Sequence, residues 1–153
     1  MENDLTIAVE SPVSEDARRL IDGSEAALAA VYTPEECFSF SPEELDTTET
    51  TFLVARLSGR PVGCIALVAN PGYGEIKRLY VDPDARGRDV GARLVKELEA
   101  CAKAQRITQM KLETGDKLAA AVRLYRRLGY SDCGPFGGYP DIDATMFLEK
   151  TLP

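Results

Sequence analysis

The run Arg86-Gly87-Arg88-Asp89-Val90-Gly91-Ala92 has the residue types and spacing of an anion-binding turn. It follows an apolar, strand-like stretch, residues 75–81, and opens an amphipathic helix expected over residues 88–105. Gly87 and Gly91 let the backbone turn tightly and approach a ligand without Cβ clashes. The free N–H groups of the first helical turn and the positive end of the helix dipole favour a phosphate there. The run therefore predicts a site for a phosphorylated small molecule, although a plain strand-to-helix connection with solvated arginines would have the same local pattern.

The basic character of this turn is local. Arg86, Arg88 and Arg93 lie within eight residues of a chain whose net charge is −7. The sequence contains no extended basic face, so a small anionic ligand is expected and a nucleic-acid partner is not.

Turn and periodicity signals indicate the elements that must position this site. Leu5 to Val9 reads as a strand, and helical sequence runs from Ser14 to about Val31, with Gly23 as a candidate break between two helices. The other expected elements are strands at 50–57, 61–69, 75–81, 108–113, near 130–133 and at 144–150, helices at 88–105 and 116–128, and a turn of helix from Pro42 within the loop 32–44.

The order of these elements predicts one α/β domain over residues 1–153. A meander of strands followed by alternating strands and helices indicates a mixed, mainly antiparallel sheet with helices on both faces. Only strands 75–81 and 108–113, joined across a helix, should run parallel through a right-handed crossover.

Length and composition agree with one domain. A chain of 153 residues with 44% hydrophobic content can bury one substantial core. No apolar run approaches the ~18 residues of a membrane span, and no secretion signal is recognised, so a cytoplasmic protein without a membrane partner is expected. The four cysteines are scattered and histidine is absent, so neither a metal site nor a disulfide framework is indicated.

The phosphate turn and a second motif give the chain a resemblance to the GNAT acyl-CoA-dependent N-acyltransferases, from Ile7 to Leu148. Arg86, Gly91 and the intervening backbone match the family's Arg/Gln-x-x-Gly-x-Gly/Ala loop, which holds the pyrophosphate of coenzyme A at a helix N-terminus. Asp89 departs from it, because it stands where the family usually has its first glycine.

The second motif is the run 121–130, Ala-Val-Arg-Leu-Tyr-Arg-Arg-Leu-Gly-Tyr, which looks like the family's late helix ending in Leu-Gly-Phe/Tyr. Leu118 stands where the family often has Asn or Gln. The resemblance implies the GNAT fold, with about seven strands, in which strands 75–81 and 108–113 splay apart and admit the acyl-CoA arm. It implies acetyl-CoA as cosubstrate, held by the residues Leu79, Tyr80, Val81, Arg86, Gly87, Arg88, Asp89, Val90, Gly91 and Ala92.

The implied chemistry is direct attack of an amine on a thioester, which needs a proton acceptor and a proton donor. Glu75 is the expected base, Glu113 is its reserve, and Tyr125 is the expected acid toward the departing sulfur. Glu75 could instead be a strand-end carboxylate paired with Lys77. Tyr125 lies on the apolar face of its helix and could instead be a buried structural tyrosine.

The expected acceptor is a small-molecule amine, held by aromatic and acidic side chains of two irregular segments. These are Tyr32, Glu35, Phe136, Tyr139 and Asp141. The same aromatic residues could instead pack on the domain or at a homodimer interface. A noncatalytic acyl-CoA-binding or sensing module is the alternative function, and covalent transfer through Cys64 or Cys133 is disfavoured because no histidine is present to activate a thiol.

Overall fold

A seven-stranded sheet organises the computed structural model, which describes residues 4–153, so that residues 1–3 of the predicted domain lie outside the described part. The strand order is β1-β2-β3-β4-β5-β7-β6, and β4 and β5 form its parallel pair. This arrangement confirms the expected mixed, mainly antiparallel sheet. The strands are β1 Leu5–Val9, β2 Thr50–Leu57, β3 Arg60–Asn70, β4 Tyr73–Val81, β5 Gln109–Gly115, β6 Ser131–Asp132 and β7 Thr145–Thr151.

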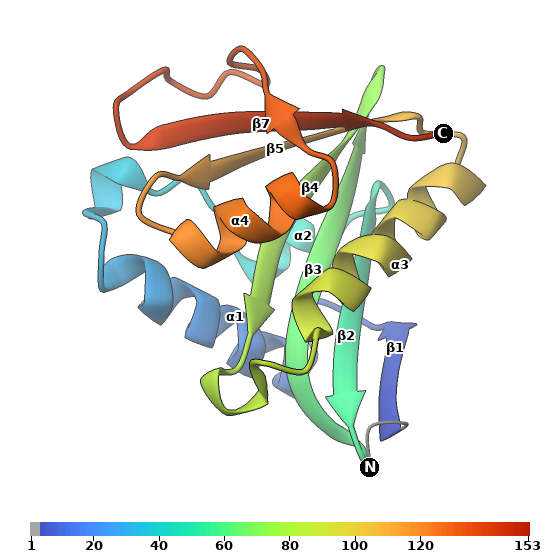
Figure 1. The fold of residues 1–153 in the computed structure, drawn as a ribbon. Coiled ribbons are helices and arrows are strands. Elements are labelled where there is room, and N and C mark those ends of the chain that lie inside the picture. The colour runs from blue at the N-terminus through green and yellow to red at the C-terminus, as the bar shows by residue number, and fades with distance from the viewer. Residues whose placement is uncertain (1–3) are drawn as a thin grey trace.

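Helices cover both faces of this sheet, as expected (Figure 1). In one layer, Leu20 of α1 packs with Phe52 and Cys64 of the strands. In the other, Leu94 of α3 packs with Leu53 and the neighbouring strand side chains. Alternate strand residues therefore serve opposite cores. The helices are α1 Glu15–Ala29, α2 Pro42–Leu45, α3 Val90–Ala104 and α4 Ala119–Arg127, with single turns η2 Pro34–Glu36 and η3 Pro83–Ala85.

Helix α1 is continuous through Gly23, so the expected break there is wrong. A Cβ at Gly23 would lie 2.7 Å from the hydroxyl oxygen of Tyr80 on β4. Glycine is present because the tyrosine packs directly on the helix, and the rest of α1 supplies enough helical sequence to span one unfavourable residue.

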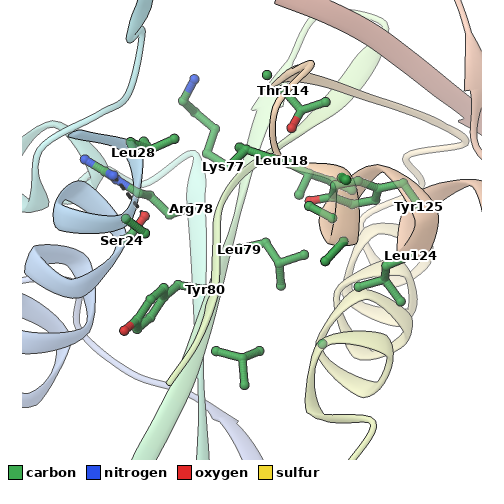
Figure 2. A pocket seen from close by; sticks show the side chains of 18 of the residues that line it. Ser24, Leu28, Lys77, Arg78, Leu79, Tyr80, Thr114, Leu118, Leu124 and Tyr125 are labelled. Atoms are coloured by element: carbon green, nitrogen blue, oxygen red, sulfur yellow. Dashed lines mark hydrogen bonds between the residues drawn. The ribbon is translucent and has the colours of Figure 1, made fainter. Parts of the chain in front are cut away.

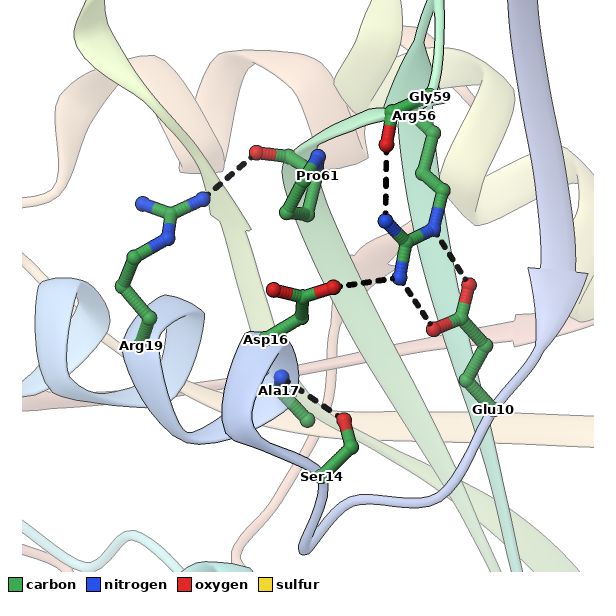
Figure 3. A network of polar contacts seen from close by, with 8 residues as sticks. All are labelled: Glu10, Ser14, Asp16, Ala17, Arg19, Arg56, Gly59 and Pro61. Carbon is green, nitrogen blue, oxygen red and sulfur yellow. Dashed lines mark hydrogen bonds and ion pairs between the residues drawn. The ribbon is translucent and has the colours of Figure 1, made fainter.

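An ion network fixes the start of α1 to β2 (Figure 3). The Arg56 guanidinium lies 2.8 Å from Glu10 Oε1 and 2.9 Å from Asp16 Oδ2. Arg19, one turn further along α1, donates to the Pro61 carbonyl at 2.7 Å. These contacts fix where α1 crosses the sheet, and α1 forms one wall of the cavity described below.

Strands β4 and β5 part soon after they pair. Their parallel register covers Gly74 to Ile76 on β4, whereas β4 continues to Val81. A bulge lets Arg78 and Leu79 of β4 oppose one residue of β3, and Arg78 has a φ of 60°. A positive φ at a non-glycine residue costs about 1–2 kcal/mol, so the surrounding contacts must hold this bend. The expected splaying of the two strands is confirmed.

Candidate functional site

A cavity of about 760 Å³ lies where β4 and β5 separate. Figure 2 shows its walls: Ser24 and Leu28 belong to α1, Arg78 belongs to β4, and Leu124 and Tyr125 belong to α4. The turn before α3 closes one end of the cavity, and the final residues of β5 line another part of it. Residues far apart in the sequence therefore share one solvent-accessible space.

The first turn of α3 presents backbone donors to this cavity. Val90, Gly91 and Ala92 all line it, and no side chain among the described residues caps the helix. By contrast, α1 is capped by Ser14, whose hydroxyl accepts from the Ala17 amide at 3.1 Å. The open N–H groups and the helix dipole are suited to hold an anion at this end of the cavity.

Asp89 turns its side chain toward α4. Its carboxylate lies 3.6 Å from Arg127 Nη2 and is 74% exposed, and its backbone has a φ of 60°, a conformation that glycine adopts more easily. The aspartate that replaces the family's glycine therefore has a strained backbone conformation. Its carboxylate is held by Arg127 at the edge of the cavity.

The two arginines of the loop have different positions. Arg86 lines the cavity, and its Nε donates to the Val81 carbonyl at 3.4 Å. Arg88 instead faces a neighbouring hollow of about 600 Å³, together with Arg93. Of the ten residues expected to hold the cofactor, nine line the large cavity and Arg88 does not.

Tyr125 is buried in the wall formed by α4 and lines the cavity. Burial raises the pKa of its phenol well above the ordinary value, so the hydroxyl stays protonated near neutral pH. Its ring contacts Tyr130 edge-on, with ring centroids 5.5 Å apart. The group can therefore donate a proton toward a ligand in the cavity.

The two candidate carboxylates have different surroundings. Glu75 is 5% exposed, its Oε2 lies 3.2 Å from Lys77 Nζ, and it also accepts from the Tyr139 hydroxyl. It is not among the residues that line the cavity, whereas Glu113 is. Burial raises the pKa of Glu113 to about 7, Lys77 opposes that shift and Glu75 adds to it. The pairing of Glu75 with Lys77, which the sequence left open, is present, and Glu113 has the setting of a proton acceptor at neutral pH.

Two buried cations of β4 hold the segment between η2 and α2 against the sheet. Lys77 Nζ donates to the Phe38 carbonyl at 3.3 Å, and Arg78 Nε donates to the Phe40 carbonyl at 3.1 Å. Arg78 also donates to Ser24 and pairs with a glutamate of α1. These roles could not be assigned from the sequence, because a lysine or arginine in a strand does not by itself indicate which loop it will contact.

The five residues expected to bind the acceptor do not gather at one place. Only Tyr32 lines the cavity; Glu35 is exposed on η2, and its neighbour Glu36 lines the cavity instead. Phe136 and Tyr139 pack against each other with ring centroids 5.6 Å apart, in an aromatic cluster that includes Tyr73 and Phe147. Asp141 is exposed in the same loop, which leaves these three outside the cavity lining.

The two cysteines considered as nucleophiles for covalent acyl transfer have raised thiol pKa values. Burial raises the pKa of Cys64 to about 12, and its Sγ donates to the Arg78 carbonyl at 3.3 Å. Burial also raises the pKa of Cys133. Neither residue lines the cavity. A thiolate nucleophile is therefore unfavourable at both positions.

Among residues 4–153, no helix has the length and apolar character needed to cross a membrane. The cytoplasmic location and the homodimer considered from the sequence stay predictions.

Comparison with known proteins identifies the class. The family described as Acetyltransferase (GNAT) family matches residues 17–130, so the chain belongs to this family of acyl-CoA-dependent N-acyltransferases. The IAA acetyltransferase of Azospirillum brasilense is 40% identical over 150 residues, which cover 97% of this chain and 98% of that protein.

Solved structures agree with this assignment. A Klebsiella pneumoniae protein, described provisionally as an acyl-CoA N-acyltransferase, has a TM-score of 0.83 and 32% identity, with 97% of each chain covered. The PaiA N-acetyltransferase of Thermoplasma acidophilum, solved with coenzyme A, shares the fold with a TM-score of 0.75 at 19% identity, covering 96% of this chain and 98% of that one. Acetyl-CoA is the cosubstrate of this family, and the uncapped α3 terminus fits its pyrophosphate.

Proposed function

We propose that the protein transfers the acetyl group of acetyl-CoA to the amine of a small molecule while both substrates are bound. One observation carries this proposal: the same cavity is lined by the uncapped first turn of α3, by Glu113 and by Tyr125. An anion site beside a proton acceptor and a proton donor meets the needs of amine attack on a thioester. The name of the A. brasilense relative adds IAA to the acceptors that should be tested.

The backbone of α3 would hold the cofactor. The amides of Val90, Gly91 and Ala92 would bind the pyrophosphate, and Arg86 would add a cation beside them. Beyond Ile76, the β4 edge no longer pairs with β5, so the main chain of Leu79 to Val81 is free to contact the pantetheine arm. When bound, acetyl-CoA supplies the thioester carbon and the thiol leaving group.

Glu113 and Tyr125 would carry out the two proton transfers of the reaction. An alkylammonium must lose a proton before it is nucleophilic, and a carboxylate with a pKa of about 7 accepts one efficiently near neutral pH. Tyr125, kept protonated by burial, would donate to the departing sulfur. Glu75, first expected as the base, would serve instead as the buried partner of Lys77.

A screen of amines, amino acids, polyamines, aminoglycosides, peptides and IAA with acetyl-CoA, followed by free-thiol release, tests this proposal. On a confirmed acceptor, Tyr125→Phe should lower kcat by roughly 10- to 10⁴-fold and leave the acetyl-CoA Kd unchanged, because only the proton donor is lost. Tyr73→Phe, outside the cavity lining, is the matched control. Tight acetyl-CoA binding without thiol release for any acceptor would favour the noncatalytic module, and full turnover by Tyr125→Phe would remove the hydroxyl from the mechanism.

A further inference from the structure

Tyr32 connects two distant parts of the chain at the cavity. It follows α1 and lies 84 residues from Asp116, whose Oδ1 accepts from the Tyr32 hydroxyl at 3.0 Å. The same hydroxyl oxygen accepts from the backbone N–H of Lys117 at 2.5 Å. The end of α1 is thus tied to the turn between β5 and α4. We call these contacts of Tyr32 with Gly115, Asp116 and Lys117 the Tyr32 joint.

Close packing supports the Tyr32 joint. Tyr32 is 7% exposed, and a Cβ on Gly115 would overlap its hydroxyl. Lys117 Nζ lies 5.5 Å from the centroid of the tyrosine ring and donates to the Val31 carbonyl at 3.4 Å. A cation of the chain itself therefore lies over the ring, so the ring is poorly placed to hold the cation of an acceptor, which was its expected role.

The Tyr32 joint supports the end of β5 where that strand has lost its partner on one side. Pairing with β4 ends at Leu112, so Glu113 and Thr114 face the cavity on that side. Strand β7 still pairs with β5 through Gly115 on the other side. On the cavity side, the Tyr32 joint packs on Gly115 and holds the two residues that directly follow β5, Asp116 and Lys117.

We propose that Tyr32 is a positioning residue that holds the end of β5, and with it the Glu113 carboxyl, in the wall of the cavity. The inference rests on the proposed function, in which Glu113 is the base. It assigns Tyr32 no contact with the reacting atoms.

The charged and titratable groups near Glu113 come from three other elements. Lys77 and Glu75 belong to β4, Cys37 follows η2, and Tyr139 belongs to the loop between β6 and β7. Tyr32 adds no charge to this set. Breaking the Tyr32 joint would change the hydration of Glu113 while leaving these groups in place, and the largest cause of its raised pKa is burial.

Tyr32→Phe tests the Tyr32 joint, because it keeps the ring and removes both hydrogen bonds. Titration of the Glu113 carboxyl by ¹³C NMR should show a midpoint near 7 in the wild-type protein and a lower midpoint in Tyr32→Phe. The matched control is Tyr130→Phe, which loses a hydroxyl bond to Glu99 (2.7 Å) outside the cavity lining and should leave the midpoint unchanged. Equal midpoints in folded wild type and Tyr32→Phe would overturn the inference.

On a confirmed acceptor, Tyr32→Phe should lower kcat by roughly 10- to 100-fold and leave the KM for acetyl-CoA unchanged, since misplacing a catalytic group by about 1 Å has effects of this size. Asp116→Asn keeps an oxygen acceptor for the tyrosine and should retain activity, whereas Asp116→Ala should resemble Tyr32→Phe. Unchanged kcat in Tyr32→Phe would also contradict the inference. The NMR titration needs no acceptor, so a failure of the Tyr32 joint is distinguishable from a failure of the proposed acetyl transfer.

Discussion

Two carboxylates on neighbouring strands, Glu75 and Glu113, differ in what each one contacts, and this difference supports the different roles that we propose for them. Glu75 is buried with Lys77 and the Tyr139 hydroxyl, so its charge is balanced inside the protein. Glu113 lines the cavity, and burial is the largest influence on its pKa. Removing one member of a buried ion pair is destabilising, so a loss of activity in Glu75→Gln would not by itself identify a base.

Glu113→Gln should remove the base and therefore lower kcat/KM by about 10²-fold or more. In the wild-type enzyme kcat/KM should rise with pH through about 7, because the carboxyl must be ionised to accept a proton, and this limb should disappear in the variant. A pH profile of both proteins checks the result. A retained limb with little loss of rate would contradict the assignment.

The same residue predicts an effect on stability. A carboxyl whose pKa is raised on folding binds more protons in the folded state, so it lowers stability as pH rises from below its unfolded pKa to above about 7. Between pH 5 and pH 8, the free energy of unfolding of Glu113→Gln should therefore rise relative to that of the wild type by on the order of 2 kcal/mol, as measured by urea unfolding. Lys111 lowers the pKa of Glu149 on β7, so Glu149→Gln should show the opposite sign.

At the scale of elements, we expect the start of α3 to set the affinity for the cofactor. Asp89 adopts a left-handed backbone and places a carboxylate beside the proposed pyrophosphate site. Asp89→Gly relieves the strain, removes the negative charge and frees Arg127 for phosphate. Coenzyme A should bind roughly 3- to 10-fold more tightly, since charge effects at a helix terminus reach about 1 kcal/mol.

Calorimetry at two salt concentrations checks this expectation, and the gain should shrink at high salt because the site is exposed. Arg127→Gln keeps the carboxylate but removes its partner, so it should weaken binding. Unchanged or weaker binding in folded Asp89→Gly would show that the carboxylate does not oppose the cofactor.

Elements with a strong local pattern could be predicted from the sequence, and features set by distant contacts could not. Helix α3 was expected over residues 88–105 and runs from Val90 to Ala104, because its apolar spacing and loop are local signals. The helix break expected at Gly23 was wrong because glycine is needed there for close packing of Tyr80, which comes 57 residues later in the chain.

The residues of the candidate site also divide into those that the sequence indicates and those whose roles depend on distant contacts. The family resemblance and the absence of histidine indicated Glu75, with Glu113 in reserve, but the choice between them depends on where β4–β5 pairing ends and on a bulge at Arg78. Neither feature has a signature in the strand sequence. Tyr32 was recognised as aromatic and close to a loop, yet its partners at Asp116 and Lys117 arise only when α1 and β5 come together.

For the whole molecule, the cavity lies between two groups of elements that also share part of one hydrophobic core. On one side lie α1 and β4, and on the other lie the end of β5 and α4. The short β4–β5 register and the Tyr32 joint connect them, and the Asp89–Arg127 bridge links the start of α3 to α4. A ligand that fills the cavity contacts both groups, so its binding should stabilise the folded chain as a unit.

Coenzyme A at 100 times its Kd should therefore add about 2.7 kcal/mol to the free energy of unfolding. For a chain of this length that corresponds to a rise in Tm of roughly 5–10 °C, which differential scanning fluorimetry can follow. Gly91→Glu should abolish the rise, because it places bulk and negative charge at the first turn of α3. Gly134→Glu adds the same side chain where no atom of residues 4–153 lies within 4 Å of the new Cβ, so it should keep the full rise. Equal rises in both variants would mean that the cofactor does not bind at the α3 terminus, and a rise lost in both would point to an effect of charge alone.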